Sequence, residues 1–259
     1  MLLLILPQLL AIQKRTFDTS KLDEASGLLK SRKYPGIFWS HNDSGAKARL
    51  YAIDAKSMSI VKRIKIKGAK NKDWEDLCYH NGKIVIADTG NNKNGRSDLK
   101  LYFFDEPNPY KDKKITIDSE VQFSYSDQAS LQPKRKNFDC EAIFSFNGEL
   151  YLLSKHRADT NTTLYRLKGS VAQKIMEYPI GGMVTAADSD GKRIAVLTYE
   201  NLFLFEPEKG SQKLLSGRIL HKYLGDIGQI EGVALDKETI YIISENGDFF
   251  TVRFKELNE

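Results

Sequence analysis

The sequence has little cysteine and no long apolar run, and both absences narrow the class of protein. Its two cysteines, Cys78 and Cys140, define no disulfide framework in a chain of 259 residues. The most apolar stretch, MLLLILPQLLAI at the N-terminus, is shorter than the roughly 20 apolar residues of a membrane-spanning helix. No segment shows a helical period of useful length. We therefore expect no transmembrane span and no helical domain.

The sequence also has no long segment in which all charged residues have the same sign. The 39 basic and 34 acidic residues leave a net charge of +5, and many of the lysines alternate with apolar residues, as on the exposed face of an outer strand. This pattern gives no contiguous basic segment for nucleic acid, so no nucleic-acid partner is predicted. A hydrophobic content of 41% is that of a globular chain with a sizeable core.

The sequence contains an internal repeat of about 45 residues. Five segments begin with polar or acidic residues and continue as an apolar strand: DEASGLL at 23, DWEDLCY at 73, DCEAIFS at 139, VTAADSD at 184 and IEGVALD at 230. A second apolar strand follows each of them. The distance from a first-strand marker (Glu24, Glu75, Glu141, Thr185, Glu231) to a second-strand marker (Ser40, Ala87, Ser154, Thr198, Ser244) is 16, 12, 13, 13 and 13 residues. Such regular spacing indicates structural repeats.

Each repeat continues as two more alternating strands around a turn, which makes four strands per unit. Four-stranded units in series are typical of a β-propeller. We predict an all-β propeller of five blades spanning residues 1–259 as one domain, with six blades as the alternative. The last unit is one strand short, so residues near 8–17 are expected to close the ring against residues near 248–254. A secretory signal is the other interpretation of the apolar N-terminus.

Large apolar residues on the repeated strands are predicted to pack between neighbouring blades. They are Trp39, Tyr51, Trp74, Leu77, Ile143, Leu152, Val196, Phe203, Val233 and Ile242.

The polar residues of the repeats are predicted to converge. In a propeller, the first strand of each blade starts, and the second strand ends, at the same mouth of the central channel. The repeat therefore predicts a ligand site at this mouth, built from Glu24, Asn42, Asp43, Glu75, Asp88, Asn92, Arg96, Glu141, Lys155, Thr185 and Glu231. Glu200 and Glu245 are expected just outside the inner ring.

Four of these residues, Glu24, Glu75, Glu141 and Glu231, are candidate metal ligands. Carboxylates held close together raise one another's pKa or bind a cation, and oxygen ligands without thiolates favour Ca²⁺ or Mg²⁺ over Zn²⁺. Ca²⁺ is the expected cofactor. The structural alternative is that each glutamate accepts hydrogen bonds from backbone N–H groups of the next blade and locks the ring.

Several motifs together resemble one group of proteins. EASGL, WSHNDSG, GAKNKDWEDL, IADTGNN, NFDCEAIF, LYLLSKHR, GMVTAAD and QIEGVA cover residues from about 20 to 254. They are similar to bacterial extracytoplasmic β-propeller proteins related in pattern to the SdiA-regulated propellers. The resemblance implies a propeller fold and a periplasmic, secreted or surface-attached location, with a cytoplasmic location as the alternative.

Two functions are compatible with an acidic channel mouth. The first is a binding module, a monomer that holds a small ligand or a protein partner at the mouth. The second is a metal-dependent hydrolase of an ester, lactone or phosphoester, in which Lys155 and Arg96 stabilise negative charge. Propellers host both, so the sequence leaves open whether the protein is an enzyme.

Overall fold

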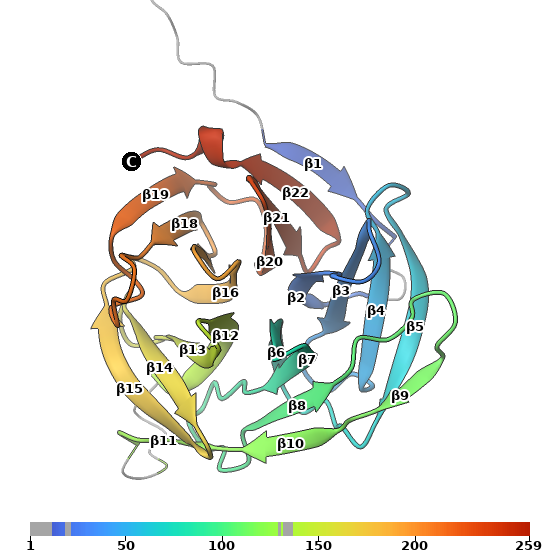
Figure 1. Cartoon of the computed structure of the whole chain (residues 1–259), viewed down its shortest axis with the longest axis horizontal. Coiled ribbons are helices and arrows are strands. Elements are labelled where there is room, and N and C mark those ends of the chain that lie inside the picture. The colour runs from blue at the N-terminus through green and yellow to red at the C-terminus, as the bar shows by residue number, and fades with distance from the viewer. Residues whose placement is uncertain (1–11, 19–21, 129–130, 132–136) are drawn as a thin grey trace, which may run out of the picture.

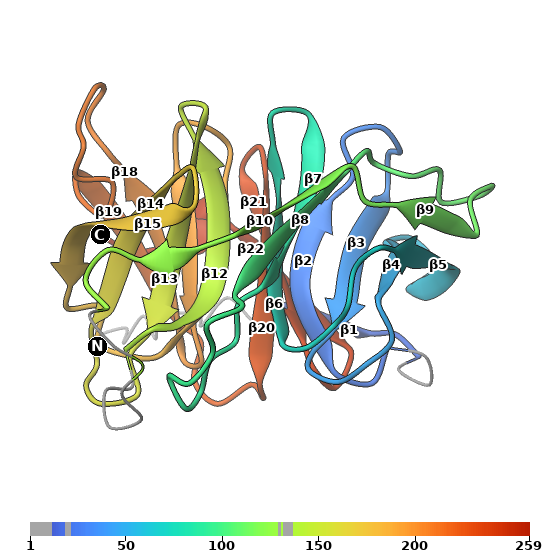
Figure 2. The same ribbon diagram turned by 90° about the horizontal axis from the view of Figure 1, so that it is seen from below.

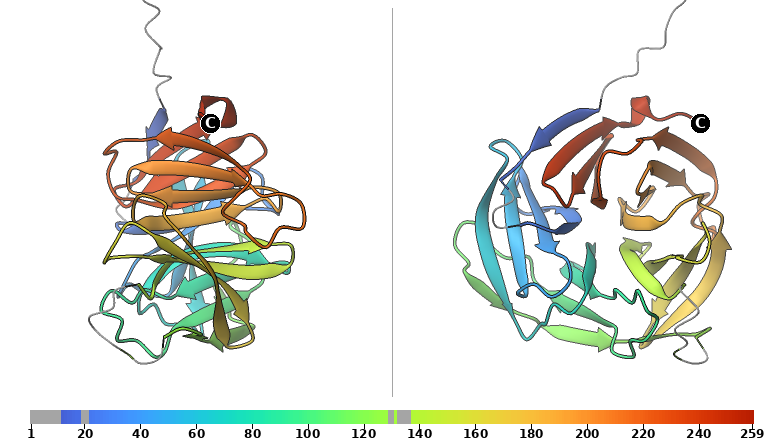
Figure 3. Two further views of the ribbon diagram at one scale, coloured as in Figure 1. Left: turned by 90° about the vertical axis from the view of Figure 1, so that its left-hand side faces the viewer. Right: turned by 180° about the vertical axis from the view of Figure 1, so that it is seen from behind.

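Five mainly antiparallel sheets surround a central axis in the computed structural model, which describes residues 12–18, 22–128, 131 and 137–259. Figure 1 shows the first strand of each blade, β2, β6, β12, β16 and β20, closest to that axis. Seen from behind, the same five blades surround the same centre (Figure 3). The five-bladed propeller predicted by the repeat is confirmed.

The strands of each blade follow one another from the axis outward. Blade 1 contains β2(Ala25–Lys30), β3(Ile37–Asn42), β4(Arg49–Asp54), β5(Ser59–Lys67) and β9(Lys114–Thr116). Blade 2 contains β6(Trp74–His80), β7(Lys83–Asp88), β8(Lys100–Phe104) and β10(Ser119–Gln122). Blade 3 contains β12(Asp139–Phe146), β13(Glu149–Lys155), β14(Thr162–Lys168), β15(Val171–Tyr178) and β11(Ser124–Tyr125).

The last two blades complete the ring. Blade 4 contains β16(Val184–Ser189), β17(Ile194–Thr198), β18(Asn201–Glu206) and β19(Arg218–Tyr223). Blade 5 contains β20(Ile230–Asp236), β21(Thr239–Ser244), β22(Asp248–Arg253) and β1(Gln13–Thr16). The one helical segment among the described residues is the 3₁₀ turn η1(Phe254–Glu256), so that part of the chain holds no helix able to cross a membrane.

The N-terminal strand closes the ring, as predicted. β1 pairs antiparallel with β22, and Gln13 to Thr16 lie opposite Thr251 to Asp248. Phe17, next along the chain, is buried between blades 5 and 1. Residues 8–11 of the predicted closing segment lie outside the described residues. Closure by the opposite end of the chain pairs an edge that β22 would otherwise leave open.

The long segment between β8 and β12 forms no sixth blade in its described residues. Its strands β9 and β11 instead add in parallel to the outer edges of blades 1 and 3, β9 to β5 and β11 to β15. Figure 2 shows this segment crossing the outside of the ring from blade 1 past blade 2 toward blade 3. The extra residues therefore widen existing sheets.

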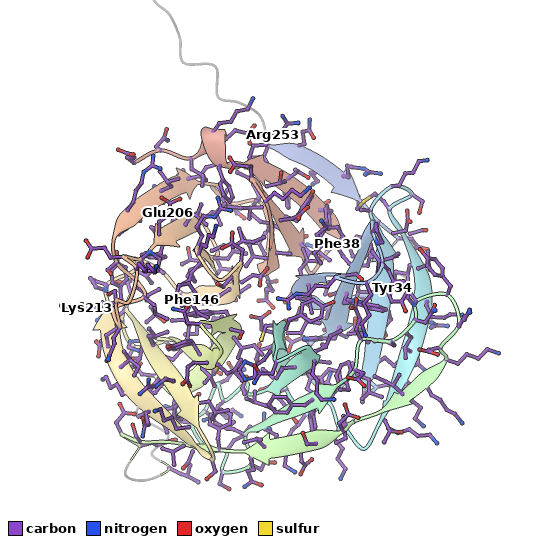
Figure 4. All side chains as sticks on the ribbon, in the orientation of Figure 1. Tyr34, Phe38, Phe146, Glu206, Lys213 and Arg253 are labelled. Carbon is purple, nitrogen blue, oxygen red and sulfur yellow. The ribbon has the colours of Figure 1, made fainter. Side chains whose placement is uncertain are left out.

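Apolar side chains fill the five spaces between blades. Each of five buried clusters draws its members from two neighbouring blades. Phe38, labelled in Figure 4, packs between blades 1 and 5 with its ring edge-on to Tyr241 and Phe249. Nine of the ten residues predicted for the core are buried, and Phe203 is half-buried against the cluster between blades 3 and 4.

Candidate functional site

A β-bulge near the start of each first strand positions the polar residues of the mouth. In blades 2 to 5 the bulged residue is Glu75, Glu141, Thr185 or Glu231, at the point where the register with the second strand shifts. A bulge places two residues opposite one and redirects a side chain without ending the strand. The repeat predicted these four positions because the bulge recurs at the same place in each unit.

Six side chains form a continuous ring of contacts around the channel, which we call the mouth ring: Asp43, Glu75, Glu141, Lys155, Tyr199 and Glu231. Carboxylate oxygens of Asp43 and Glu75, of Glu75 and Glu141, and of Glu231 and Asp43 lie within 4.8 Å of each other. Lys155 and Tyr199 complete the ring between Glu141 and Glu231. All five blades contribute at least one member.

One half of the mouth ring carries its own neutralising charges. Lys155 Nζ lies 2.8 Å from Glu141 Oε2 and 2.9 Å from the Tyr199 hydroxyl, which donates to Glu231 Oε1 at 3.1 Å. Arg157 contacts Glu141 at 3.3 Å as well as Asp139 at 2.7 Å. Burial alone lowers the pKa of Lys155, but Glu141 and Tyr199 outweigh burial and the net shift is upward. Lys155 is therefore positively charged, and its contacts with Glu141 and Tyr199 fix its position.

The other half has carboxylates without a cation. Asp43, Asp73 and Glu75 each place one oxygen within 4.8 Å of the other two. Among the described residues, no lysine, arginine or histidine forms an ion pair with any of the three. Gly90 makes room for two of them, because a Cβ on Gly90 would overlap Glu75 Oε1 and Asp73 Oδ2.

A second carboxylate group, Asp43 with Glu231 and Glu245, adjoins this half. Burial, followed by the charge of Glu231, raises the pKa of Asp43 to about 7. Burial, followed by Glu231 and Asp43, raises the pKa of Glu245 to about 7. Burial, followed by Glu141 and Asp43, also raises the pKa of Glu75. These carboxylates disfavour one another's charge in the absence of a cation.

These shifts predict how stability depends on pH. In buffer free of divalent cations, we expect the contribution of Asp43 and Glu245 to the free energy of unfolding to fall as pH rises from about 4 to about 8. A carboxyl with a folded-state pKa near 7 binds its proton more tightly than the unfolded chain does, so its stabilising effect is lost as pH rises through that value. For Asp43 the loss is on the order of 1–3 kcal/mol after solvent screening is discounted.

Thermal melts recorded by circular dichroism from pH 4 to pH 8 measure this dependence. Asp43→Asn should flatten the curve, because the asparagine has no proton to lose. Equal pH slopes in the parent and in Asp43→Asn would contradict the assignment.

The remaining predicted residues lie outside the mouth ring. Some lie at the outer edge of the mouth, which we call the rim, and others hold a supporting loop in place. Glu24 precedes β2 and is exposed. It belongs neither to the two carboxylate groups above nor to a third, formed by Glu75, Asp139 and Glu141, but its charge contributes to the raised pKa values of Asp43 and Glu245. In blade 1 the bulge falls instead at Gly27 and Leu28. The repeat alignment was thus displaced by three residues in the first unit, and Glu24 lies at the rim.

Arg96 and Asp88 belong to the scaffold of one loop. Arg96 donates to Asp88 at 2.9 Å, to Asp98 at 3.2 Å and to the Gly90 carbonyl at 2.9 Å. These contacts join the end of β7 to the segment that follows it and hold Gly90 next to Asp73 and Glu75. The charge of Arg96 also opposes the rise in the pKa of Asp73 that burial causes.

The two predicted asparagines lie at the rim. The Asn42 amide nitrogen donates to Asp23 at 2.8 Å, and its buried amide oxygen has no hydrogen-bond partner among the described residues. Asn92 is exposed and accepts a hydrogen bond from Arg157.

Serine and threonine hydroxyl groups connect neighbouring blades at the channel by donating to backbone carbonyls. Ser26 donates to the Glu75 carbonyl at 2.6 Å, Thr89 to the Cys140 carbonyl at 2.9 Å, and Thr185 to the Ile230 carbonyl at 2.7 Å. Among the described residues, no backbone N–H group donates to the carboxylates of the bulged glutamates. These contacts therefore do not support the alternative in which the glutamates accept hydrogen bonds from backbone N–H groups of the next blade. Thr185, in contrast, does connect two blades through its hydroxyl group.

Two residues of the site were missed by the sequence analysis. Tyr199 follows Thr198 just as Lys155 follows Ser154, so applying the repeat consistently would have selected it in place of the exposed Glu200. Asp73 lies two residues before Glu75, as Asp139 lies two residues before Glu141, whereas the fourth and fifth repeats have Met183 and Gln229 at this position. Only its approach to Asp43 identifies it.

Comparisons with known proteins support the fold. No family model matches the chain, and no curated protein matches it. Among solved structures, glutaminyl cyclase of Myxococcus xanthus is similar with a TM-score of 0.52 at 12% identity, over 93% of this chain and 94% of that one. The β-propeller domain of Cps50 (Swd1) from Myceliophteria thermophila gives a TM-score of 0.47 at 10% identity, over 93% and 99% of the two chains.

Virginiamycin B lyase from Staphylococcus aureus gives a TM-score of 0.44 at 12% identity. The alignment covers 88% of this chain and 66% of the lyase. At 12% identity the likeness to the glutaminyl cyclase concerns the fold alone and says nothing about activity.

Proposed function

We propose that the protein is a binding module that holds a divalent cation, Ca²⁺, at the channel mouth and uses it to bind a ligand there. The observation that carries this proposal is the half of the mouth ring in which Asp43, Asp73 and Glu75 converge without a cationic partner among the described residues. Hard carboxylate oxygens of this kind suit Ca²⁺, which accepts irregular geometry.

The asymmetry of the mouth ring supports this choice of location. Lys155 and Arg157 already neutralise Glu141 and Asp139, so a cation gains most on the side of Asp43 and Asp73. Burial and, after it, repulsion from neighbouring carboxylates raise the pKa of Asp43 and of Glu75, and a cation there would relieve the repulsion. Three protein carboxylates leave further coordination positions for water or for oxygen atoms of a ligand.

A location outside the cytoplasm, which the motif resemblance implies, agrees with such a site. Extracellular Ca²⁺ modules bind with Kd values of about 10⁻⁴ to 10⁻³ M, and a partly exposed carboxylate triplet falls in that class. We propose this location together with the cation.

The hydrolase alternative has less support. Its two charge-stabilising residues, Lys155 and Arg96, are both engaged, Lys155 with Glu141 and Tyr199, and Arg96 with Asp88 and Asp98. Both charges are thus already paired with carboxylates, which leaves less positive charge to stabilise an anion that develops during a reaction.

Calcium titration tests the proposal. At a Ca²⁺ concentration of 100 times Kd, preferential binding to the folded protein stabilises it by about 2.7 kcal/mol, which corresponds to a rise in melting temperature of about 5–10 °C for a chain of this size. Glu75→Gln and Asp73→Asn should each remove most of this rise while the variants stay folded. Isothermal titration calorimetry should report the same loss of affinity.

Glu24→Gln is the matched control, because it removes the same charge at the rim without touching a carboxylate group. It should keep the calcium response. If the parent does not respond to millimolar Ca²⁺, or if Glu24→Gln loses as much of the response as Glu75→Gln, the proposed site is wrong.

A further inference from the structure

A row of three cations crosses the outer strands of blade 1. Arg49 on β4 lies opposite Lys65 on β5, and Lys65 lies opposite Lys114 on β9. Residues that are directly opposite on paired strands project from the same face of the sheet. We call these three residues the basic row. Lys65 and Lys114 are exposed, and Arg49 is half-buried.

The basic row lacks counter-charges. Among the described residues, no aspartate or glutamate forms an ion pair with Arg49, Lys65 or Lys114. By contrast, Lys100 on the corresponding outer strand of blade 2 pairs with Glu120 at 2.6 Å. Like charges directly opposite each other destabilise a sheet. Repulsion within the basic row therefore lowers the free energy of unfolding of the unliganded protein.

A groove adjoins the basic row on the same face of the ring as the acidic mouth. Its volume is about 640 Å³, within the size range of small-molecule sites. Four of its lining residues are cationic, Lys47, Arg49, Lys65 and Lys70, and none of them has an ion pair within the described parts of the chain. Ile66 and three alanines supply an apolar surface.

We infer that this groove binds a small molecule that carries two or more phosphate groups. Lysine and arginine side chains are the usual partners of phosphate, and closely spaced cations favour a ligand with several charges over a single anion. The row of cations on adjacent strands, about 4.8 Å apart, provides a series of contacts for successive phosphates.

The chemistry of the groove favours a small ligand over nucleic acid. Binding of single strands relies on aromatic side chains that stack on bases, and no aromatic residue lines the groove. The exposed Tyr110 packs edge-on against Tyr34, beside the β2–β3 turn at the opposite face of the ring. The site is also distinct from the proposed calcium site, although Asn71 at the groove wall donates to the Asn42 and Asp43 carbonyls.

Inorganic pyrophosphate is the probe, titrated calorimetrically into the full-length protein in buffer stripped of metal ions by resin. Metal-free buffer keeps the test independent of the calcium site and prevents chelation of Ca²⁺ by the probe. We expect pyrophosphate to bind more tightly than orthophosphate, and its affinity to fall as NaCl is raised. Lys65→Glu should weaken pyrophosphate binding about tenfold or more.

Lys65→Glu should also change stability, and in the direction opposite to its effect on binding. Because the introduced carboxylate would lie between Arg49 and Lys114, Lys65→Glu should raise the melting temperature of the unliganded protein by about 2–4 °C. Lys168→Glu is the matched control: Lys168 is exposed, has no ion pair among the described residues and lies opposite Val171. It should change neither affinity nor stability.

Two results would overturn the inference. One is the absence of pyrophosphate binding at millimolar concentration, including the case in which a single-stranded oligonucleotide binds instead. The other is an equal loss of affinity in Lys168→Glu and Lys65→Glu, which would indicate an effect of net charge alone.

Discussion

Deletion of residues 1–18 should lower the melting temperature by about 10 °C or more. The deletion removes β1, which pairs along its length with β22, and Phe17, which is 3% exposed in the cluster between blades 5 and 1. Loss of a buried phenylalanine side chain alone costs about 3–5 kcal/mol, and about 2–4 °C of melting temperature accompanies each kcal/mol in a chain of this size. Differential scanning calorimetry measures the change.

A shorter deletion separates closure from other effects of the N-terminus. A variant lacking residues 1–11 keeps β1 and Phe17, so the difference between the two truncations reports on the closing strand. Phe17→Ala should account for about half of the loss. If the protein without residues 1–18 melts like the protein without residues 1–11, closure of the ring does not contribute to stability.

Asp76→Ala should cost about 3–5 kcal/mol, or about 10 °C in melting temperature. The Asp76 carboxylate is fully buried and accepts backbone N–H groups of three blades: Leu77 at 2.8 Å, Ile143 at 2.9 Å and Ala187 at 3.4 Å. Alanine leaves these donors without a partner inside the ring. Burial raises the pKa of Asp76 and the three N–H groups oppose that rise.

Two variants serve as comparisons for Asp76→Ala. Asp76→Asn keeps a carbonyl oxygen as acceptor and should recover part of the lost stability. Glu75→Gln, at the adjacent residue, should melt close to the parent because no backbone N–H group of the described residues donates to the Glu75 side chain. Unfolding monitored in urea gives the free energies. An Asp76→Ala protein as stable as the parent would show that solvent or a shifted side chain satisfies the three donors.

Much of the fold could be predicted from the sequence because it is repeated five times. The number of residues between the first and second strands is set locally by the length of a hairpin. It can therefore be recognised in the sequence of each repeat. A missing strand in the last unit likewise predicts closure, because an unpaired edge is costly. The same reasoning explains why the large residues between blades, such as Trp39 and Trp74, were identified correctly.

The site was less predictable, since a shift of one residue changes which side chain reaches the channel. The repeat selected Glu75, Glu141 and Glu231, which occupy bulges, but it selected Glu24 where the bulge lies at Gly27. It selected Glu200 where Tyr199 completes the mouth ring. Bulges alter the register by one residue, and a sequence pattern does not show where the register shifts.

The sequence by itself determined the five-bladed ring, its closure and the presence of carboxylates at one mouth, because strand length, alternation and turns are encoded locally in each unit. Only the tertiary structure decided which charges meet. Lys155 neutralises Glu141 while Asp43, Asp73 and Glu75 converge without a cation among the described residues. Lys114 joins Arg49 and Lys65 because β9 pairs with β5, from which it is distant in sequence. Charges interact through space over a few ångströms, and those distances exist only after the blades have packed.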